Sequence, residues 1–183
     1  MLRGWFCPPH AYIFSRKLLE KNNDGNPWDE RLWQNQDIDL LYQLVFQNPK
    51  FVFCPGALVY YRKNTHSVAG EYSERTLNSR ILVLEKITDR ISRSGIIERY
   101  QEAIADAWLN LARDSYRVNK SRSITLAKIA RNFYPDVKPR GKFLYRMIYR
   151  LNGFETAQNA WAFKELILSK IQSLRKFSRS TTG

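Results

Sequence analysis

The sequence has few cysteines and no long apolar run, and both absences narrow the kind of protein it encodes. There are 2 cysteines among 183 residues. Two distant cysteines do not make the disulfide framework of a small secreted domain, so we expect a reducing, cytoplasmic compartment. No run of about 18 apolar residues occurs, so we expect no membrane-spanning helix. The first residues also lack the apolar stretch and cleavage site of a signal peptide.

Acidic residues are scarce in the last third of the chain. Residues 115–183 hold fifteen Lys or Arg and three Asp or Glu, while the whole chain has a net charge of +13. The first two thirds are therefore close to neutral. Such a one-sided distribution indicates a basic surface with an anionic partner, either phospholipid, nucleic acid or a phosphorylated substrate.

The first seventy residues combine apolar, β-rich runs with two helical patterns. Ser15 is a good N-cap, so a short helix is expected at 16–21. A second helix is expected from residue 35 or 37 to about 47, before Asn48-Pro49. Runs rich in β-branched and aromatic residues predict strands, the last two joined by a bend, at 11–14, 50–54 and 57–62.

From about residue 72 the pattern changes to long helices. Apolar residues recur at helical spacing, and turn-forming residues separate the helical stretches. The expected helices are 72–91, 97–118, 121–133, 141–151 and 155–177, the last two divided at Asn152-Gly153. We therefore expect an α/β segment at 1–70, followed by an all-α helical extension at 71–183.

Asp37 lies where a polar loop meets an apolar helix, which makes it a candidate for acid–base chemistry. The helix behind it has too many apolar residues for one stripe, so we expect it to be buried. Asp37 and Asp39 are two residues apart and do not face each other, so at most one can point into a shared cleft. The structural alternative is that both simply favour the positive end of the helix dipole.

Two sets of residues could bind a metal, but the positions of their members in the sequence do not favour it. Cys7 and His10, with Cys54 and His66, offer four possible zinc ligands, but the second spacing is long and Cys54 lies in an apolar run. Asp37-Ile38-Asp39 has the form of a metal–diphosphate motif, yet it opens an apolar helix instead of following a strand. We assign a metal to neither set.

Five motifs in order resemble the second half of the catalytic domain of family 2 glycosyltransferases. A proline patch and an apolar run precede Arg16-Lys17-Leu18-Leu19. Trp28-Asp29-Glu30 is similar to the family's Phe-Asp-Glu, and Gln36-Asp37-Ile38-Asp39-Leu40 is similar to its Glu-Asp-x-Asp-Leu. The closing strand of the family is matched by Pro55 and Val59-Tyr60-Tyr61-Arg62, with Ser67 downstream.

The resemblance implies inverting transfer of a sugar from a nucleotide-sugar donor to a glycan or lipid-linked acceptor. Asp37 would be the general base that takes the proton from the acceptor hydroxyl. Asp39 would be structural or would lie on the acceptor side. The resemblance places the remaining residues on two sides of the site: Pro9 and His10 toward the acceptor, and Arg62, His66 and Ser67 toward the diphosphate.

The resemblance covers about seventy residues and departs from the family pattern in two ways. Gln36 stands where the family usually has Glu. The family's first half, with its nucleotide-binding strands, has no counterpart in this sequence. We therefore expect a partial type-A glycosyltransferase fold without the N-terminal nucleotide-binding half: a fragment, a split product or a degenerate relative. The full enzyme would use a divalent metal, Mg²⁺ or Mn²⁺, whose main ligand motif is absent from this chain.

The basic tail supports a different, non-catalytic hypothesis. Between residues 138 and 179, Lys and Arg alternate with large apolar residues. This pattern is typical of an amphipathic surface that binds the inner face of an anionic membrane, near lipid-linked acceptors. A solvated face on ordinary packed helices has the same pattern. Nucleic acid is a less favoured partner because no DNA- or RNA-binding motif is present.

Overall fold

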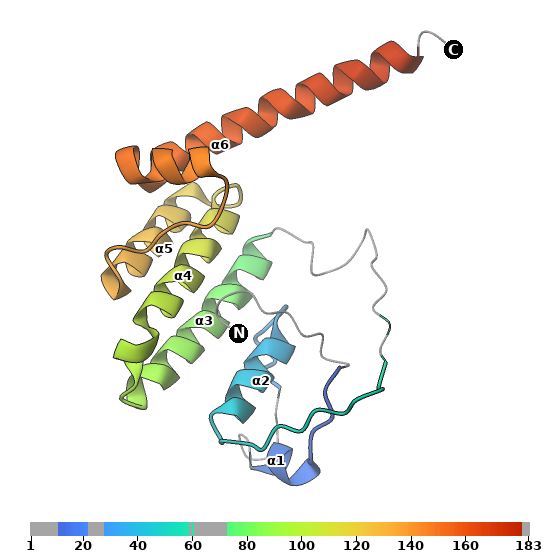
Figure 1. The fold of residues 1–183 in the computed structure, drawn as a ribbon, viewed down its shortest axis with the longest axis vertical. Helices are drawn as coiled ribbons and strands as arrows, with labels where there is room; N and C mark the ends of the chain where they lie inside the picture. The colour runs from blue at the N-terminus through green and yellow to red at the C-terminus, as the bar shows by residue number, and fades with distance from the viewer. Residues whose placement is uncertain (1–10, 22–27, 59, 61–72, 181–183) are drawn as a thin grey trace.

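The part of the chain that the structure describes consists of α-helices joined by turns and loops (Figure 1). The computed structural model describes residues 11–21, 28–58, 60 and 73–180. The helices are α1 (Arg16–Glu20), α2 (Gln36–Val45), α3 (Glu74–Arg93), α4 (Ile97–Ser115), α5 (Lys120–Phe133) and α6 (Phe143–Ser180).

The prediction of an α/β segment is wrong, because the described residues contain no strand and no sheet. The runs at 11–14 and 50–54, and the described part of 57–62, have no strand pairing. Ile13, Phe53 and Tyr60 are 101%, 87% and 92% exposed. A β-rich run becomes a strand when a neighbour pairs with its backbone and covers its side chains, and no described segment does either.

Helix boundaries follow local capping and turn signals, as the sequence predicted for most of them. Ser15 caps α1 with its side chain. The turn after α3 contains Gly95, whose φ of 68° suits a residue without Cβ. α5 begins at Lys120, one residue before the expected start at 121, and Asn119 caps it. Ser123 is buried, and its hydroxyl donates a hydrogen bond to the backbone carbonyl of Ala112 in α4.

The core lies where α3, α4 and α5 pack together. α2 lies beside α3, and the first part of α6 lies against the far side of the bundle (Figure 1). Trp108 of α4 is buried, and its Nε1 donates to Thr88 Oγ1 of α3 at 3.3 Å. Leu32, which precedes α2, belongs to the same buried cluster as the bundle residues. Core packing therefore continues from the N-terminal segment into the helical extension.

α6 is interrupted at Gly153, as the sequence predicted. Gly153 has φ 82° and ψ −178°, a combination that essentially only glycine adopts. Close to this point Tyr145, Tyr149 and Phe154 are buried against the bundle. Farther along, the apolar side chains between 163 and 171 are exposed, and the helix extends beyond the bundle (Figure 1). No helix in the described part of the chain is both long enough and apolar enough to cross a bilayer.

Candidate functional site

Two of the family-like motifs meet at one lysine of α3. Lys86 Nζ lies 3.1 Å from Asp29 Oδ2 and 2.5 Å from Asp39 Oδ2. Asp39 is 2% exposed, and Gln43 Nε2 donates a further hydrogen bond to it at 2.7 Å. A buried carboxylate requires such partners because desolvation otherwise penalises its charge. Lys86 therefore joins the turn at residues 29–32 to the start of α2 and gives Asp39 a structural partner.

Asp29 fixes the turn that precedes α2. The Arg31 guanidinium donates to both of its carboxylate oxygens, at 2.8 and 2.7 Å, and the Arg31 backbone N–H donates at 3.1 Å. The hydrogen bonds from Arg31 hold the pKa of the Asp29 carboxyl well below its usual range; burial opposes this effect and Lys86 adds to it. Asp29 is therefore a permanent anion near neutral pH and a poor proton acceptor.

Asp37 has a different environment from both of these carboxylates. It is the second residue of α2, half-buried, and its side chain forms no hydrogen bond or ion pair with any residue that the structure describes. The N-cap of α2, Asn35, has φ 64° and makes no side-chain cap. Asp37 therefore lies in the first turn of a helix whose N-cap residue makes no side-chain cap. The two carboxylates of α2 are separated as their spacing predicted.

Sequence reasoning missed Lys86, the residue that organises this site. The only local signal is its position on α3, where Val83 and Ile87 are buried on either side of it. This spacing places Lys86 at the edge of the apolar face of α3, where a lysine can reach a buried acid. Sequence reasoning also missed the contact between Trp33 and α3. The guanidinium carbon of Arg75 on α3 lies 3.7 Å from the ring centroid of Trp33.

The remaining predicted site residues fall outside the part of the chain that the structure describes. These are Pro9 and His10 on the acceptor side, and Arg62, His66 and Ser67 on the diphosphate side. Their roles stay predictions.

A divalent metal does not fit the carboxylates that the structure describes. Among these residues, no three His, Cys, Asp or Glu side chains lie close enough together to hold a metal ion. Asp29 and Asp39 come near one another only through Lys86, whose ammonium group takes the place that a cation would need. Cys54, the described member of the possible zinc set, is exposed. The expected Mg²⁺ or Mn²⁺ stays a prediction for the full enzyme.

Comparison with known proteins adds no family assignment. No protein-family model matches the chain, and no curated protein or solved structure matches it. The glycosyltransferase resemblance therefore rests on the sequence motifs alone.

Proposed function

We propose that the chain forms the acceptor side of an inverting glycosyltransferase and that Asp37 is its general base. The observation that carries this proposal is the unequal environment of two neighbouring carboxylates. Asp39 is buried and paired with Lys86, whereas Asp37 is half-buried and has no side-chain partner among the described residues. Of the two, Asp37 therefore has the carboxylate that is free to accept a proton.

The proposed reaction joins a glycan or lipid-linked hydroxyl to a sugar carried by a nucleotide. Asp37 takes the hydroxyl proton while the acceptor oxygen attacks the anomeric carbon from the face opposite the nucleotide. The glycosidic bond forms as the bond to the diphosphate breaks, and the nucleoside diphosphate leaves with the electron pair. This geometry inverts the anomeric configuration. The resemblance places Arg62 beside the diphosphate, where its charge would stabilise the leaving group.

The test is turnover by the native protein, purified from its source cell with any polypeptide that stays bound to it. Release of nucleoside diphosphate from a panel of nucleotide sugars, with and without added acceptor glycans, measures the transfer. Asp37→Asn removes the proton acceptor with little change in side-chain size. We expect kcat/KM to fall about 10²–10⁴-fold, which is the usual contribution of a general base.

Glu85→Gln is the matched control for this substitution. Glu85 is an exposed carboxylate on α3 that takes no part in the Lys86 cluster, so its loss should leave turnover unchanged. Circular dichroism of both variants checks that the helices are intact. Turnover that survives in Asp37→Asn would show that another group is the base.

The exposed part of α6 favours a second function, contact with an anionic membrane. Phe163 and Leu166 are 65% and 54% exposed, in a stretch that is rich in Lys and Arg. Exposed apolar side chains beside cations on one helix favour binding to anionic lipid through both partitioning and charge attraction. Such contact would hold the enzyme beside lipid-linked acceptors.

Vesicle sedimentation tests this second function. We expect the chain to sediment with vesicles of phosphatidylglycerol and phosphatidylcholine at low salt, and to be released at about 1 M salt, where the Debye length is about 3 Å. Phe163→Ser with Leu166→Ser should weaken sedimentation. Val52→Ser, at an exposed apolar residue outside α6, should not. No sedimentation at low salt would remove the membrane function.

A further inference from the structure

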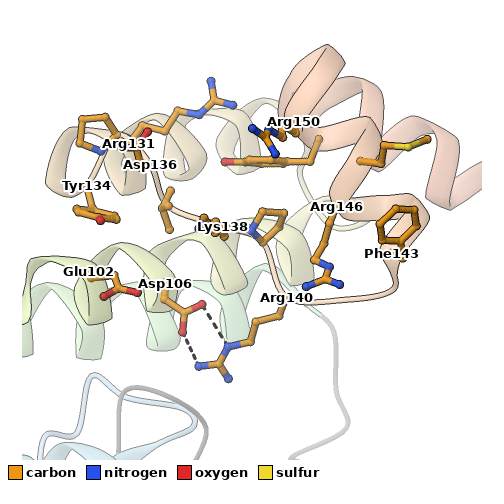
Figure 2. A pocket seen from close by; sticks show the side chains of 15 residues that line it. Glu102, Asp106, Arg131, Tyr134, Asp136, Lys138, Arg140, Phe143, Arg146 and Arg150 are labelled. Atoms are coloured by element: carbon orange, nitrogen blue, oxygen red, sulfur yellow. Dashed lines mark hydrogen bonds and ion pairs between the residues drawn. The ribbon is translucent and has the colours of Figure 1, made fainter.

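A cleft that neither proposed function uses lies between α4, the connection from α5 to α6, and the start of α6. Its volume is about 1090 Å³. Glu102 and Asp106 of α4 form one wall, and side chains of α5 and α6 form the opposite wall (Figure 2). The connecting residues 134–140 line it between these walls. This volume slightly exceeds the usual range for small-molecule sites, which is about 300–1,000 Å³.

The charges that line the cleft are unbalanced. Asp106 is neutralised by Arg140, whose Nε lies 3.2 Å from Asp106 Oδ1 and whose Nη2 pairs with the other oxygen (Figure 2). The other two acids are Glu102 and Asp136. The cleft is also lined by four more cations, whose side chains make no hydrogen bond or ion pair with any described residue: Arg131, Lys138, Arg146 and Arg150.

A buried hydroxyl on the wall of the cleft lacks a partner. Tyr149 lines the cleft and is 8% exposed, and its hydroxyl forms no hydrogen bond with any described residue. The guanidinium carbon of Arg131 lies 5.4 Å from the ring centroid of Tyr149, so the ring and this cation belong to the same wall. The hydroxyl oxygen itself has almost no exposed surface, so it lies within the wall and does not face the space of the cleft.

The edge of the cleft is apolar. Phe143 and Met147, which lie one turn apart at the start of α6, line the cleft and are 73% and 42% exposed. A ligand that binds among the cations of the cleft would therefore place any apolar portion against these two side chains.

We propose that this cleft binds a phosphate monoester group. Such a group carries a charge of about −1.5 to −2 at neutral pH and three acceptor oxygens. That charge matches the excess of two cations in the cleft, and arginine donors suit phosphate oxygens in bidentate geometry. A carboxylate ligand offers one charge and two oxygens and would leave part of this donor set unpaired. The proposal depends on neither the transferase role nor the α6 membrane contact.

Binding of three probes to the full chain tests the proposal and separates its possible sources. Titration calorimetry with inorganic phosphate and with glycerol 3-phosphate measures the binding of a soluble phosphate group and of a soluble phosphate ester. Vesicles containing phosphatidic acid, compared with phosphatidylcholine alone, represent a lipid head group. We expect Arg146→Gln with Arg150→Gln to weaken binding of each probe that binds by about tenfold or more, since each lost charge-assisted hydrogen bond has a large effect.

Two controls separate the cleft from general surface charge. Arg99→Gln with Lys128→Gln removes the same charge at exposed residues that do not line the cleft, and we expect it to leave binding of the soluble probes within about twofold. Tyr149→Phe removes only the buried, unpaired hydroxyl and no charge, so its melting temperature should stay the same or rise and its affinity for the soluble probes should stay within about twofold.

Each outcome decides for or against the cleft. Binding of the soluble probes that is lost in the cleft variants supports the proposal, and additional specific binding of phosphatidic acid identifies a lipid as its source. Absence of binding by all three probes overturns it. Equal losses in the cleft double variant and in the control double variant also overturn it, because binding would then follow overall charge.

Discussion

Asp29 is paired with Arg31, whose side chain is exposed, and with the partly buried Lys86. Its pKa in the folded state is held well below the unfolded value of about 3.9. The carboxylate therefore contributes its full stabilisation above about pH 4, and this contribution is lost as the pH falls through the depressed pKa of the folded state. A charged side chain that bridges two elements thus makes this turn sensitive to acid.

We expect Asp29→Asn to lower the free energy of unfolding by on the order of 1–3 kcal/mol at pH 7, and by less at pH 3. Urea denaturation of both proteins at the two pH values measures the difference. Asp89→Asn is the control, because Asp89 forms only an exposed ion pair with Arg93 and should change stability by about 0.5 kcal/mol or less. An equal loss at both pH values would mean that charge is not the reason for the effect.

The separation of Asp37 from Asp39 could be predicted from the sequence because it depends on helix periodicity alone. The ion pair of Asp39 could not be predicted, because its partner Lys86 lies 47 residues away. Only the packing of α2 on α3 brings the two charges together. The environment that distinguishes the two acids is therefore a property of the tertiary structure.

At the scale of elements, α6 is divided by a single residue. Gly153 has backbone angles that cost a residue with a Cβ about 1–3 kcal/mol. We expect Gly153→Ala to lower the free energy of unfolding by that amount, although a Cβ there would meet no atom within 4 Å. Chemical denaturation followed by circular dichroism measures it. Asn152→Ala, at the exposed preceding position, should have an effect within about 0.5 kcal/mol. No effect in Gly153→Ala would mean that α6 straightens at no cost.

Helices were predicted well and strands were not, and the difference has a physical cause. Helical hydrogen bonds form within one segment, so spacing, caps and glycines are sufficient to predict α3, α4 and the interruption of α6. A strand depends on a partner elsewhere in the chain. The runs around Ile13 and Phe53 have strand composition, but no described segment pairs with them, and they stay exposed.

At the scale of the whole molecule, one buried cluster extends from Leu32 into α3 and α4. Leu32 is 3% exposed, so Leu32→Ala should lower the free energy of unfolding by about 2–5 kcal/mol. We expect the whole helical signal in circular dichroism to shift to lower denaturant in a single transition. Leu58→Ala, at a residue that is 80% exposed, should shift it little. An unchanged helical transition in Leu32→Ala would mean that the bundle is stable without the N-terminal segment.

The pairing of Asp39 with Lys86 also has a consequence for the order of folding. The connections from α3 to α4 and from α4 to α5 span only residues 94–96 and 116–119, whereas Asp39 and Lys86 are 47 residues apart. The entropic cost of closing a loop rises with its length, and chains form local contacts faster than distant ones. The bundle should therefore assemble first, with α2 docking on it afterwards. In that order, the carboxylate of Asp39 loses its hydration water only in the final step, when a preassembled lysine is ready to replace it.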